Sequence, residues 1–268
     1  MNESISTRTI FSIVIISVFA AFLVGGFVGY WGKTALPEEH HRWFETLSLF
    51  LGQGLMILPI YYFLSTKKFE VKKALRLNPV SKNVAYASFP IALGVIILVD
   101  EFDRLISIVI PPPESLLQMS TQLKFDGTFA AFLLWVTIII IAPIGEELVF
   151  RGFLQRSLER IWKDVTKAVL ITSMVFAMVH LNPFWIIQIY VLGVVLGYLS
   201  WRTKSVLPGI IVHGLNNGLA LVLSQDNFTG FESIYTFHGH VSPIWILVGG
   251  IALFLGFKLL HESTEALA

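Results

Sequence analysis

Cysteine is absent from this chain, and charged residues are scarce. None of the 268 residues is cysteine, and only 14% are Asp, Glu, Lys or Arg. Without cysteine the protein can have no disulfide, no thiolate metal site and no cysteine nucleophile. Soluble domains contain about 25% charged residues, so the deficit excludes an ordinary soluble protein. The net charge of +1 gives no indication of nucleic-acid binding.

Apolar residues are in excess, at 55% of the sequence. A helix rises about 1.5 Å per residue and the hydrocarbon core is about 30 Å thick, so runs of roughly 17 to 25 apolar residues predict membrane-spanning helices. Eight runs qualify, near 10–30, 44–64, 84–99, 129–150, 168–181, 184–201, 206–223 and 244–260. The first is longer than a signal-peptide core, so we interpret it as an uncleaved span. The sequence therefore predicts an all-α, polytopic membrane protein of about eight transmembrane helices, with residues 1–268 forming one domain in the lipid bilayer.

The basic residues predict the orientation of these helices, because Lys and Arg gather in cytoplasmic loops. Loops 65–83 and 151–167 are strongly basic, and with the N-terminus inside, 15 of the 19 Lys and Arg residues lie on the cytoplasmic side. The four left outside are Lys33, Arg42, Arg104 and Lys124. Both termini are therefore expected in the cytoplasm, and the membrane would be the plasma membrane if the source is prokaryotic.

Three connecting segments carry further expectations. The outer loop 100–128, with "DEFDR" and "PPPE", is interpreted as a linker. The segment "FLQRSLERIWK" is typical of an amphipathic helix at the membrane interface. The pair Asn182–Pro183 is expected to form a tight turn between the fifth and sixth spans.

Ionisable side chains inside a membrane span indicate a structural or functional role, because inserting each one costs about 2.5 to 3.5 kcal/mol on insertion scales. Glu146 and Glu147 lie near the expected cytoplasmic end of the fourth span. Glu147 and Arg151 have the i, i+4 spacing of a helical ion pair, which is more often structural than catalytic and would support the site. Glu146 is then the free acid and the candidate general base.

Two histidines and an asparagine complete the set. His213 and Asn217 share one face of the seventh span, where an imidazole and a carboxamide could donate hydrogen bonds to an oxyanion. His180 lies on a third helix. A single buried histidine or asparagine is more often an interhelical contact, but four polar groups on three helices can satisfy one another. Straight helices place His213 about 10 Å and His180 about 18 Å from the cytoplasmic end, which we reconcile by a later start of the fifth helix, with 152–167 along the interface.

Three short motifs occur in a recognisable order. They are "EELVFRG", which fits EExxxR with Glu146, Glu147 and Arg151; "FAMVH", which fits FxxxH with Phe176 and His180; and "HGLNN", which fits HxxxN with His213 and Asn217. In order and spacing, residues of about 129–223 resemble the CAAX protease and bacteriocin-processing (Abi) family, whose best-known branch is the type II CAAX prenyl endopeptidase.

The resemblance implies an intramembrane endopeptidase of eight helices whose active site opens toward the cytosol. In such an enzyme Glu146 with His180 activates the attacking water, and His213 with Asn217 stabilises the oxyanion. The implied substrate is a peptide or a lipidated peptide. Two alternatives stay open: a bacteriocin-immunity or scaffold protein without essential proteolysis, and a proton-coupled transporter. Against transport, the sequence lacks matching broken half-helices in two repeats.

No cofactor is expected, although zinc is an alternative. A metalloprotease could use Glu146, His180 and His213 as ligands, since two histidines, a glutamate and a water form an established zinc set. The helix motif HExxH is absent from the sequence. Asn217 carries an amide, which is a poor zinc ligand but a good oxyanion donor. We therefore predict a glutamate-activated water without an obligatory metal.

Overall fold

The computed structural model describes residues 5–114, 123–223, 225 and 229–265, and these are almost entirely helical. The N-terminal part contains α1 (Thr7–Ala35), η1 (Glu38–His40), α2 (His41–Leu55), α3 (Leu58–Thr66), α4 (Val71–Ala74) and α5 (Lys82–Val109). The central part contains α7 (Phe129–Val136), η2 (Thr137–Ile141), α8 (Ala142–Glu147), η3 (Leu148–Gln155), α9 (Arg156–Trp162) and α10 (Val165–Val179). The last part contains α11 (Ile186–Thr203), α12 (Leu207–Leu223), α13 (Thr229–Tyr235), β1 (Thr236–Phe237), β2 (His240–Val241) and α14 (Pro243–Glu265).

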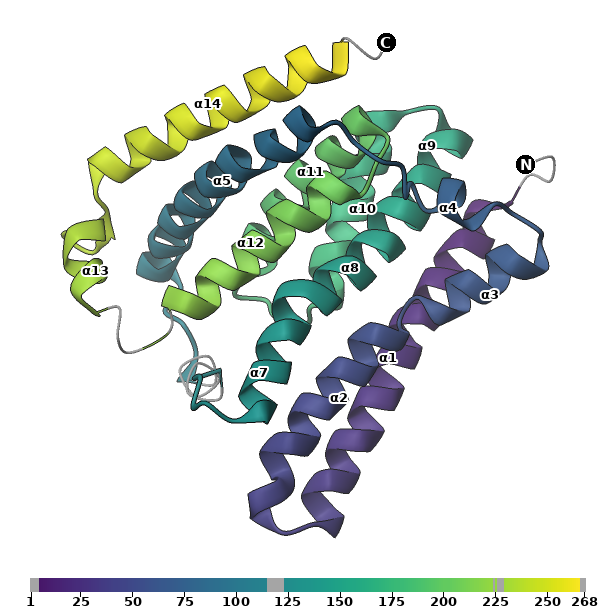
Figure 1. Ribbon diagram of the computed structural model, residues 1–268, viewed down its shortest axis with the longest axis horizontal. Coiled ribbons are helices and arrows are strands. Elements are labelled where there is room, and N and C mark those ends of the chain that lie inside the picture. Colours follow the sequence, from purple (N-terminus) through teal and green to yellow (C-terminus); the bar gives the residue numbers. More distant parts are fainter. Residues whose placement is uncertain (1–4, 115–122, 224, 226–228, 266–268) are drawn as a thin grey trace.

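The helices fall into the eight expected spans. Within the described residues, six stretches are long and apolar enough to cross a membrane: Thr7–Ala35, Glu38–Thr66, Lys82–Val109, Phe129–Trp162, Ile186–Thr203 and Pro243–Glu265. The two shorter apolar helices are α10 and α12. The prediction of an all-helical, polytopic membrane protein is therefore confirmed. The start of α1 and the end of α14 both lie in the upper right part of Figure 1, and the assignment of that side to the cytoplasm stays a prediction.

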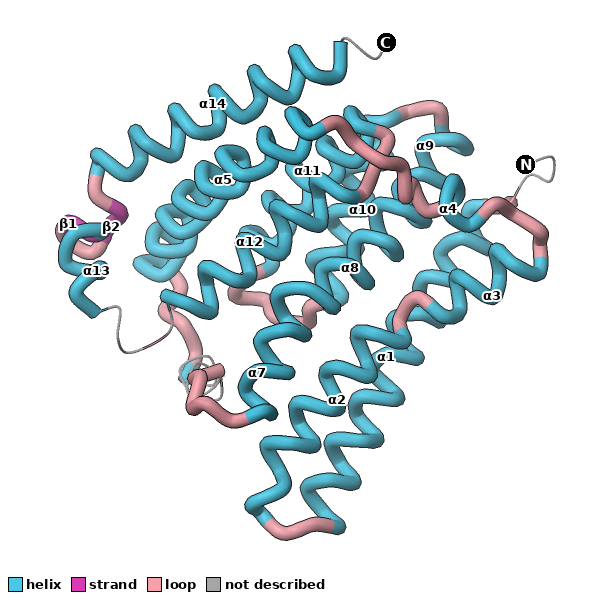
Figure 2. The backbone as a smooth tube through the Cα atoms, in the orientation of Figure 1, coloured by secondary structure: helices cyan, strands magenta, loops and turns pink. Residues whose placement is uncertain are grey.

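The helices are arranged around a central group. In Figure 1, α14 and α5 lie on one side, the α1–α2 hairpin lies on the other, and α10, α11 and α12 lie between them. Helix α14 approaches α5 closely, because a Cβ atom at Gly94 would lie only 2.6 Å from the Gly249 carbonyl oxygen. Such contacts between small residues are how membrane helices pack without a hydrophobic driving force. The antiparallel pair β1–β2 joins α13 to α14 (Figure 2).

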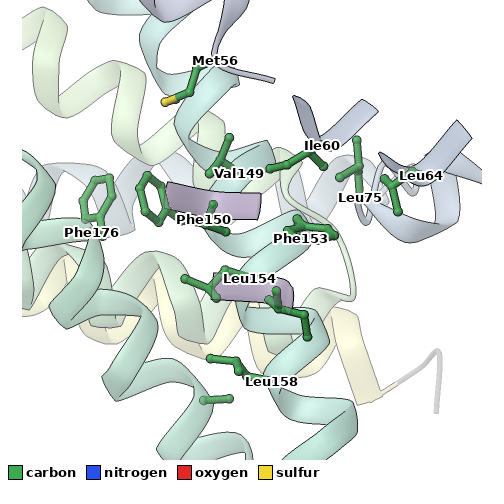
Figure 3. Close-up of a cluster of buried hydrophobic side chains, with 13 residues drawn as sticks. Met56, Ile60, Leu64, Leu75, Val149, Phe150, Phe153, Leu154, Leu158 and Phe176 are labelled. Carbon is green, nitrogen blue, oxygen red and sulfur yellow. The ribbon is translucent and has the colours of Figure 1, made fainter. Parts of the chain in front are cut away.

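A buried apolar cluster packs α1, α2 and α3 against the central helices (Figure 3). Its members are Ile10, Val14, Met56, Ile60, Leu64, Leu75, Val149, Phe150, Phe153, Leu154, Leu158, Ala168 and Phe176. Phe150 and Phe176 meet edge to face with 5.3 Å between ring centroids. Some members of this cluster lie on the same helices as the polar site residues. The packing of the cluster therefore fixes the orientation of these helices.

The outer connection after the third span is shorter than expected. The charged residues of "DEFDR" are helical, because α5 continues to Val109. They remain helical because they are paired: Arg104 Nε contacts Asp100 Oδ2 at 3.0 Å, and its Nη2 contacts Glu232 Oε1 at 3.1 Å. Interpreting Asp100–Arg104 as linker is therefore wrong. Residues 115–122 of the expected linker lie outside the described part of the chain.

The fourth span is longer than expected, and "FLQRSLERIWK" continues it. Helices η3 and α9 carry the chain without a break to Trp162. Leu154, Gln155 and Leu158 are fully buried against the protein, so the prediction of a separate interfacial helix is wrong. The expected tight turn at Asn182 is confirmed, since its Oδ1 accepts the backbone N–H of Phe184 at 3.1 Å between α10 and α11.

Candidate functional site

An antiparallel helical hairpin brings Glu146 and His180 to the same level. The arm α8–η3–α9 turns at Lys163, whose left-handed conformation (φ 53°) ends the helix, and α10 then runs back. Asp164 starts α10 as its N-cap by accepting the Lys167 N–H at 2.9 Å. Glu146 and His180 are equally far along the chain from Lys163, so the two arms return them to one another.

Two imidazole rings face one oxygen of Glu146. His180 Nε2 lies 3.8 Å and His213 Nε2 lies 3.7 Å from Glu146 Oε2. Glu146 is only 8% exposed, and among the described residues this oxygen has no hydrogen-bond partner. These separations exceed a direct hydrogen bond and suit a bridging water molecule. The structure therefore brings together three of the four proposed catalytic side chains.

The other ring nitrogens determine which tautomers are present. His180 Nδ1 lies 2.7 Å from the Phe176 carbonyl oxygen, and His213 Nδ1 lies 3.3 Å from Glu147 Oε1. A carbonyl oxygen or an ionised carboxylate can only accept, so both Nδ1 atoms carry hydrogen. In the neutral rings, both Nε2 lone pairs then point toward Glu146 Oε2. Glu146 Oε2 and the two Nε2 atoms are then three acceptors around one point, which a donor such as a water molecule can bridge.

The expected ion pair between Glu147 and Arg151 is present and completely buried. Arg151 Nη1 contacts Glu147 Oε1 at 2.6 Å, and both side chains are 0% exposed. Arg151 Nη2 also donates to the Gly193 carbonyl at 3.2 Å, and the guanidinium lies 4.1 Å from the centre of the Phe176 ring. Since Glu147 also accepts from His213, the pair orients that imidazole, a contact that spacing within one helix could not predict.

The start of α12 explains how His213 reaches the level of His180. Ser205 and Val206, which precede this helix, are fully buried. The Val206 N–H donates to the Arg76 carbonyl at 3.0 Å, and Ser205 Oγ donates to the Asn78 carbonyl at 2.6 Å. Helix α12 therefore begins inside the protein, under the 75–81 loop.

The reconciliation suggested by the sequence is thus wrong. Helix α10 begins at Val165, before the expected residue 168, and 152–162 is part of the preceding helix. That helix continues beyond Glu147 for about 22 Å, so the carboxylates do not lie at its end. His213 reaches the level of His180 because α12 begins inside the protein. This buried start depends on contacts with a distant loop.

Asn217 has a structural partner of its own. Its Nδ2 donates to the Ile138 carbonyl at 3.1 Å, and its Oδ1 accepts from Asn216 Nδ2 at 3.3 Å. Ile138 lies in η2, a π-helical turn in which each carbonyl bonds the N–H five residues on. For Ile138 that residue is Pro143, which has no N–H. The Asn217 amide replaces the missing donor, and an amide nitrogen retains a second hydrogen for another acceptor.

A cavity of about 550 Å³ opens beside Glu146 and His180. Its opposite wall comes from α1 and α2 and includes Gln53, whose Oε1 is buried without a hydrogen-bond partner among the described residues. A sequence search for ionisable residues missed Gln53 because its side chain is uncharged. A lone amide within the apolar run 44–64 was the available signal.

Across residues 5–114, 123–223, 225 and 229–265, no group of three His, Asp or Glu side chains is arranged to hold a metal ion.

Comparison with known proteins gives one family match and one similar curated protein. Residues 128–219 match the family model described as type II CAAX prenyl endopeptidase Rce1-like. A UPF0177 protein, YbdI, from Lactococcus lactis subsp. lactis (strain IL1403) is 29% identical over 98 residues, which cover 36% of this chain and 52% of that protein. The match thus spans about half the length of this curated relative. No solved structure matches the chain.

The matched region contains every residue of the polar cluster, from Glu146 on α8 to Asn217 on α12, whereas α1–α5 and α14 lie outside it. The three motifs, the contacts among their side chains and the family match agree with one another. Over residues 128–219, the chain is therefore similar to the Rce1-like type II CAAX prenyl endopeptidase family.

Proposed function

We propose that this protein is a membrane-embedded endopeptidase that hydrolyses a peptide bond with a water molecule activated by Glu146. The observation that carries the proposal is the convergence of His180 Nε2 and His213 Nε2 on Glu146 Oε2, at 3.8 and 3.7 Å, beside an open cavity. A water molecule between these atoms could donate its two hydrogens to Glu146 Oε2 and His180 Nε2 and be held for attack. The family match supports peptide hydrolysis as the chemistry.

The proton transfers follow from the tautomers. Glu146 takes one proton from the water as the oxygen attacks the peptide carbonyl, and His180 Nε2 orients the water by accepting its second hydrogen. Protonated Glu146 then delivers the proton to the leaving amine. Both steps use the same carboxyl group, so it is restored at the end of the cycle.

The oxyanion requires donors. His213 can donate from Nε2 only when its ring is protonated, because its Nδ1 already faces Glu147 Oε1 at 3.3 Å. The buried Glu147 carboxylate stabilises that positive ring. Asn217 supplies a second donor through the Nδ2 hydrogen that Ile138 does not use. Such fixed donors in a dry site are worth about 10² to 10³ in rate each.

The proposed substrate is a peptide or lipidated peptide that reaches the site from the cytosolic side of the membrane. Residues Glu146, His180, His213 and Asn217 are assigned catalytic roles, and Glu147 with Arg151 positions His213. No metal takes part in this scheme.

The experiment is cleavage by protein reconstituted in vesicles, with internally quenched apolar peptides and a farnesylated peptide as probes. Glu146→Gln should reduce cleavage by about 10² to 10⁴ while preserving the fold. Glu262→Gln is the matched control, because that side chain is 61% exposed on α14. Proton-driven uptake without cleavage would instead support a transporter. Absence of cleavage by the unmodified protein, or full activity in Glu146→Gln, would overturn the proposal.

A further inference from the structure

The cavity beside Glu146 continues as a trough along the α1–α2 hairpin. Its residues recur every three or four positions on both helices, as one face of each helix requires. On α1 they include Val18, Phe22 and Tyr30, and on α2 they include Ser48, Leu49 and Gln53. The far end carries the Lys33–Glu45 ion pair, with 2.7 Å between Nζ and Oε1. The trough is therefore apolar along its length and polar at its two ends.

Gln53 lies at the catalytic end of this trough. A Cβ atom at Gly145, the residue before Glu146, would lie 2.9 Å from the Gln53 carbonyl oxygen, so α2 and α8 are in direct contact at this level. The Gln53 side chain lines the same cavity as Glu146 and His180. It comes from a helix outside the region matched by the family model.

Among the described residues, the side-chain oxygen of Gln53 has no hydrogen-bond partner, although it is buried. A carboxamide presents a donor and an acceptor side by side, which are the two groups of a peptide unit. An aliphatic or isoprenoid chain in the trough would leave this oxygen unsatisfied, and buried unpaired polar groups are costly.

We propose that the trough binds an extended apolar peptide segment of the substrate, and that Gln53 determines its register by pairing with a backbone amide next to the scissile bond. This proposal rests on the proposed endopeptidase function and names the substrate-binding wall of that site. The apolar residues of α1 and α2 contact the substrate side chains, while the chemistry stays with α8, α10 and α12.

The first test compares two methionine variants, one inside the trough and one outside it. Gln53→Met keeps the size of the side chain but removes its hydrogen-bonding groups, and Leu58→Met is the control, because Leu58 is 51% exposed on α3 and does not line the cavity. With the quenched apolar peptides, Gln53→Met should lower kcat/KM about tenfold, mainly through KM. Leu58→Met should change it less than about twofold. Equal effects of the two variants would overturn the role of Gln53.

A second test removes the partner group from the probe. Ester versions of the peptides, each lacking one backbone N–H, should be cleaved less efficiently by the unmodified protein at one position near the scissile bond. Gln53→Met should not discriminate between amide and ester at that position, as the coupling of two interacting groups requires. Identical discrimination by both proteins would contradict the pairing.

A third test identifies the occupant without relying on cleavage. A benzophenone amino acid placed at Gln53, in Glu146→Gln protein, should form adducts with the peptide probe. The same group at Tyr62, which is 72% exposed on α3, should form adducts with lipid. Lipid adducts alone at Gln53 would show a lipid-filled trough and overturn the inference. Because binding is measured, failure of catalysis would refute the proposed function separately.

Discussion

The side-chain amide of Asn217 replaces a backbone donor for Ile138. The two groups are 3.1 Å apart, although 79 residues separate them in the sequence. The need arises from Pro143, which cannot supply the N–H expected five residues after Ile138 in a π-helical turn. Asn217 therefore fastens α12 to the helix that carries Glu146, in addition to its proposed role at the oxyanion.

These two roles of Asn217 can be separated. Asn217→Ala should lower turnover by about 10² to 10³ and the free energy of unfolding by about 1 to 3 kcal/mol, because the Ile138 carbonyl loses its donor. Pro143→Ala restores the backbone N–H. In that background, Asn217→Ala should cost much less stability and the same turnover. Kinetics and denaturant unfolding in micelles measure both, and a turnover loss that disappears with the stability loss would refute the oxyanion role.

The buried pair Glu147–Arg151 should dominate the stability of the site. Arg151→Met removes the charge that compensates Glu147, which is 0% exposed, so the free energy of unfolding should fall by about 3 to 5 kcal/mol. Lys73→Met is the control, because the Lys73–Glu70 pair is exposed and surface changes cost within about 0.5 kcal/mol. Similar unfolding curves for the two variants would mean that Glu147 is compensated elsewhere.

Arg76 should influence activity from outside the cavity. Its guanidinium pairs with Glu159 on α9, and its carbonyl accepts the Val206 N–H at the start of α12. Arg76→Ala should therefore lower kcat more than it raises KM. Arg76→Lys should restore part of the loss, because it returns a positive charge beside Glu159, whereas both variants keep the backbone carbonyl contact. Lys258→Ala, in an exposed pair on α14, should leave kcat unchanged; a lower kcat there would indicate a nonspecific effect.

Single cysteines test the orientation, and the cysteine-free sequence makes each one unique. Lys72→Cys in the exposed α4 segment should react with impermeant thiol reagents only from the cytoplasmic side. Glu39→Cys, between α1 and α2, should react only from the outer side. Reversed labelling would place the buried start of α12 at the outer surface and contradict a cytosolic site.

Chelation tests the metal-free scheme. Protein dialysed against a strong chelator should keep its activity, and elemental analysis should find well under one zinc per chain. A loss of cleavage that only zinc restores would make Glu146, His180 and His213 ligands instead.

The spans were predictable because bilayer thickness sets helix length and composition. Their ends were less predictable because they depend on pairing. Charges at Asp100 and Arg104 resemble loop residues in sequence, but the contact with Glu232 on α13 keeps them in a helix. Likewise, the polar residues after Glu147 suggested an interface, whereas Gln155 donates to the Gly197 carbonyl at 2.9 Å inside the bundle.

The site was predictable where one helix supplies both partners. The spacing of Glu147 and Arg151 predicts their ion pair, and motif order places His180 and His213 near Glu146. Contacts between distant segments could not be predicted from the sequence, because local spacing carries no information about them. The hydrogen bond from the Val206 N–H to the Arg76 carbonyl and the one from Asn217 to the Ile138 carbonyl are both contacts of this kind.

The two walls of the cavity come from separate stretches of the chain, 18–56 on one side and 146–180 on the other. Mutations in the first stretch can therefore alter which substrates are selected while inherited chemistry in the second is unchanged. Exchanging residues 7–66, which form α1, α2 and α3, between homologues should transfer substrate preference along with them. Divergence of a duplicated copy toward a new target would then begin with changes in the codons for residues 7–66.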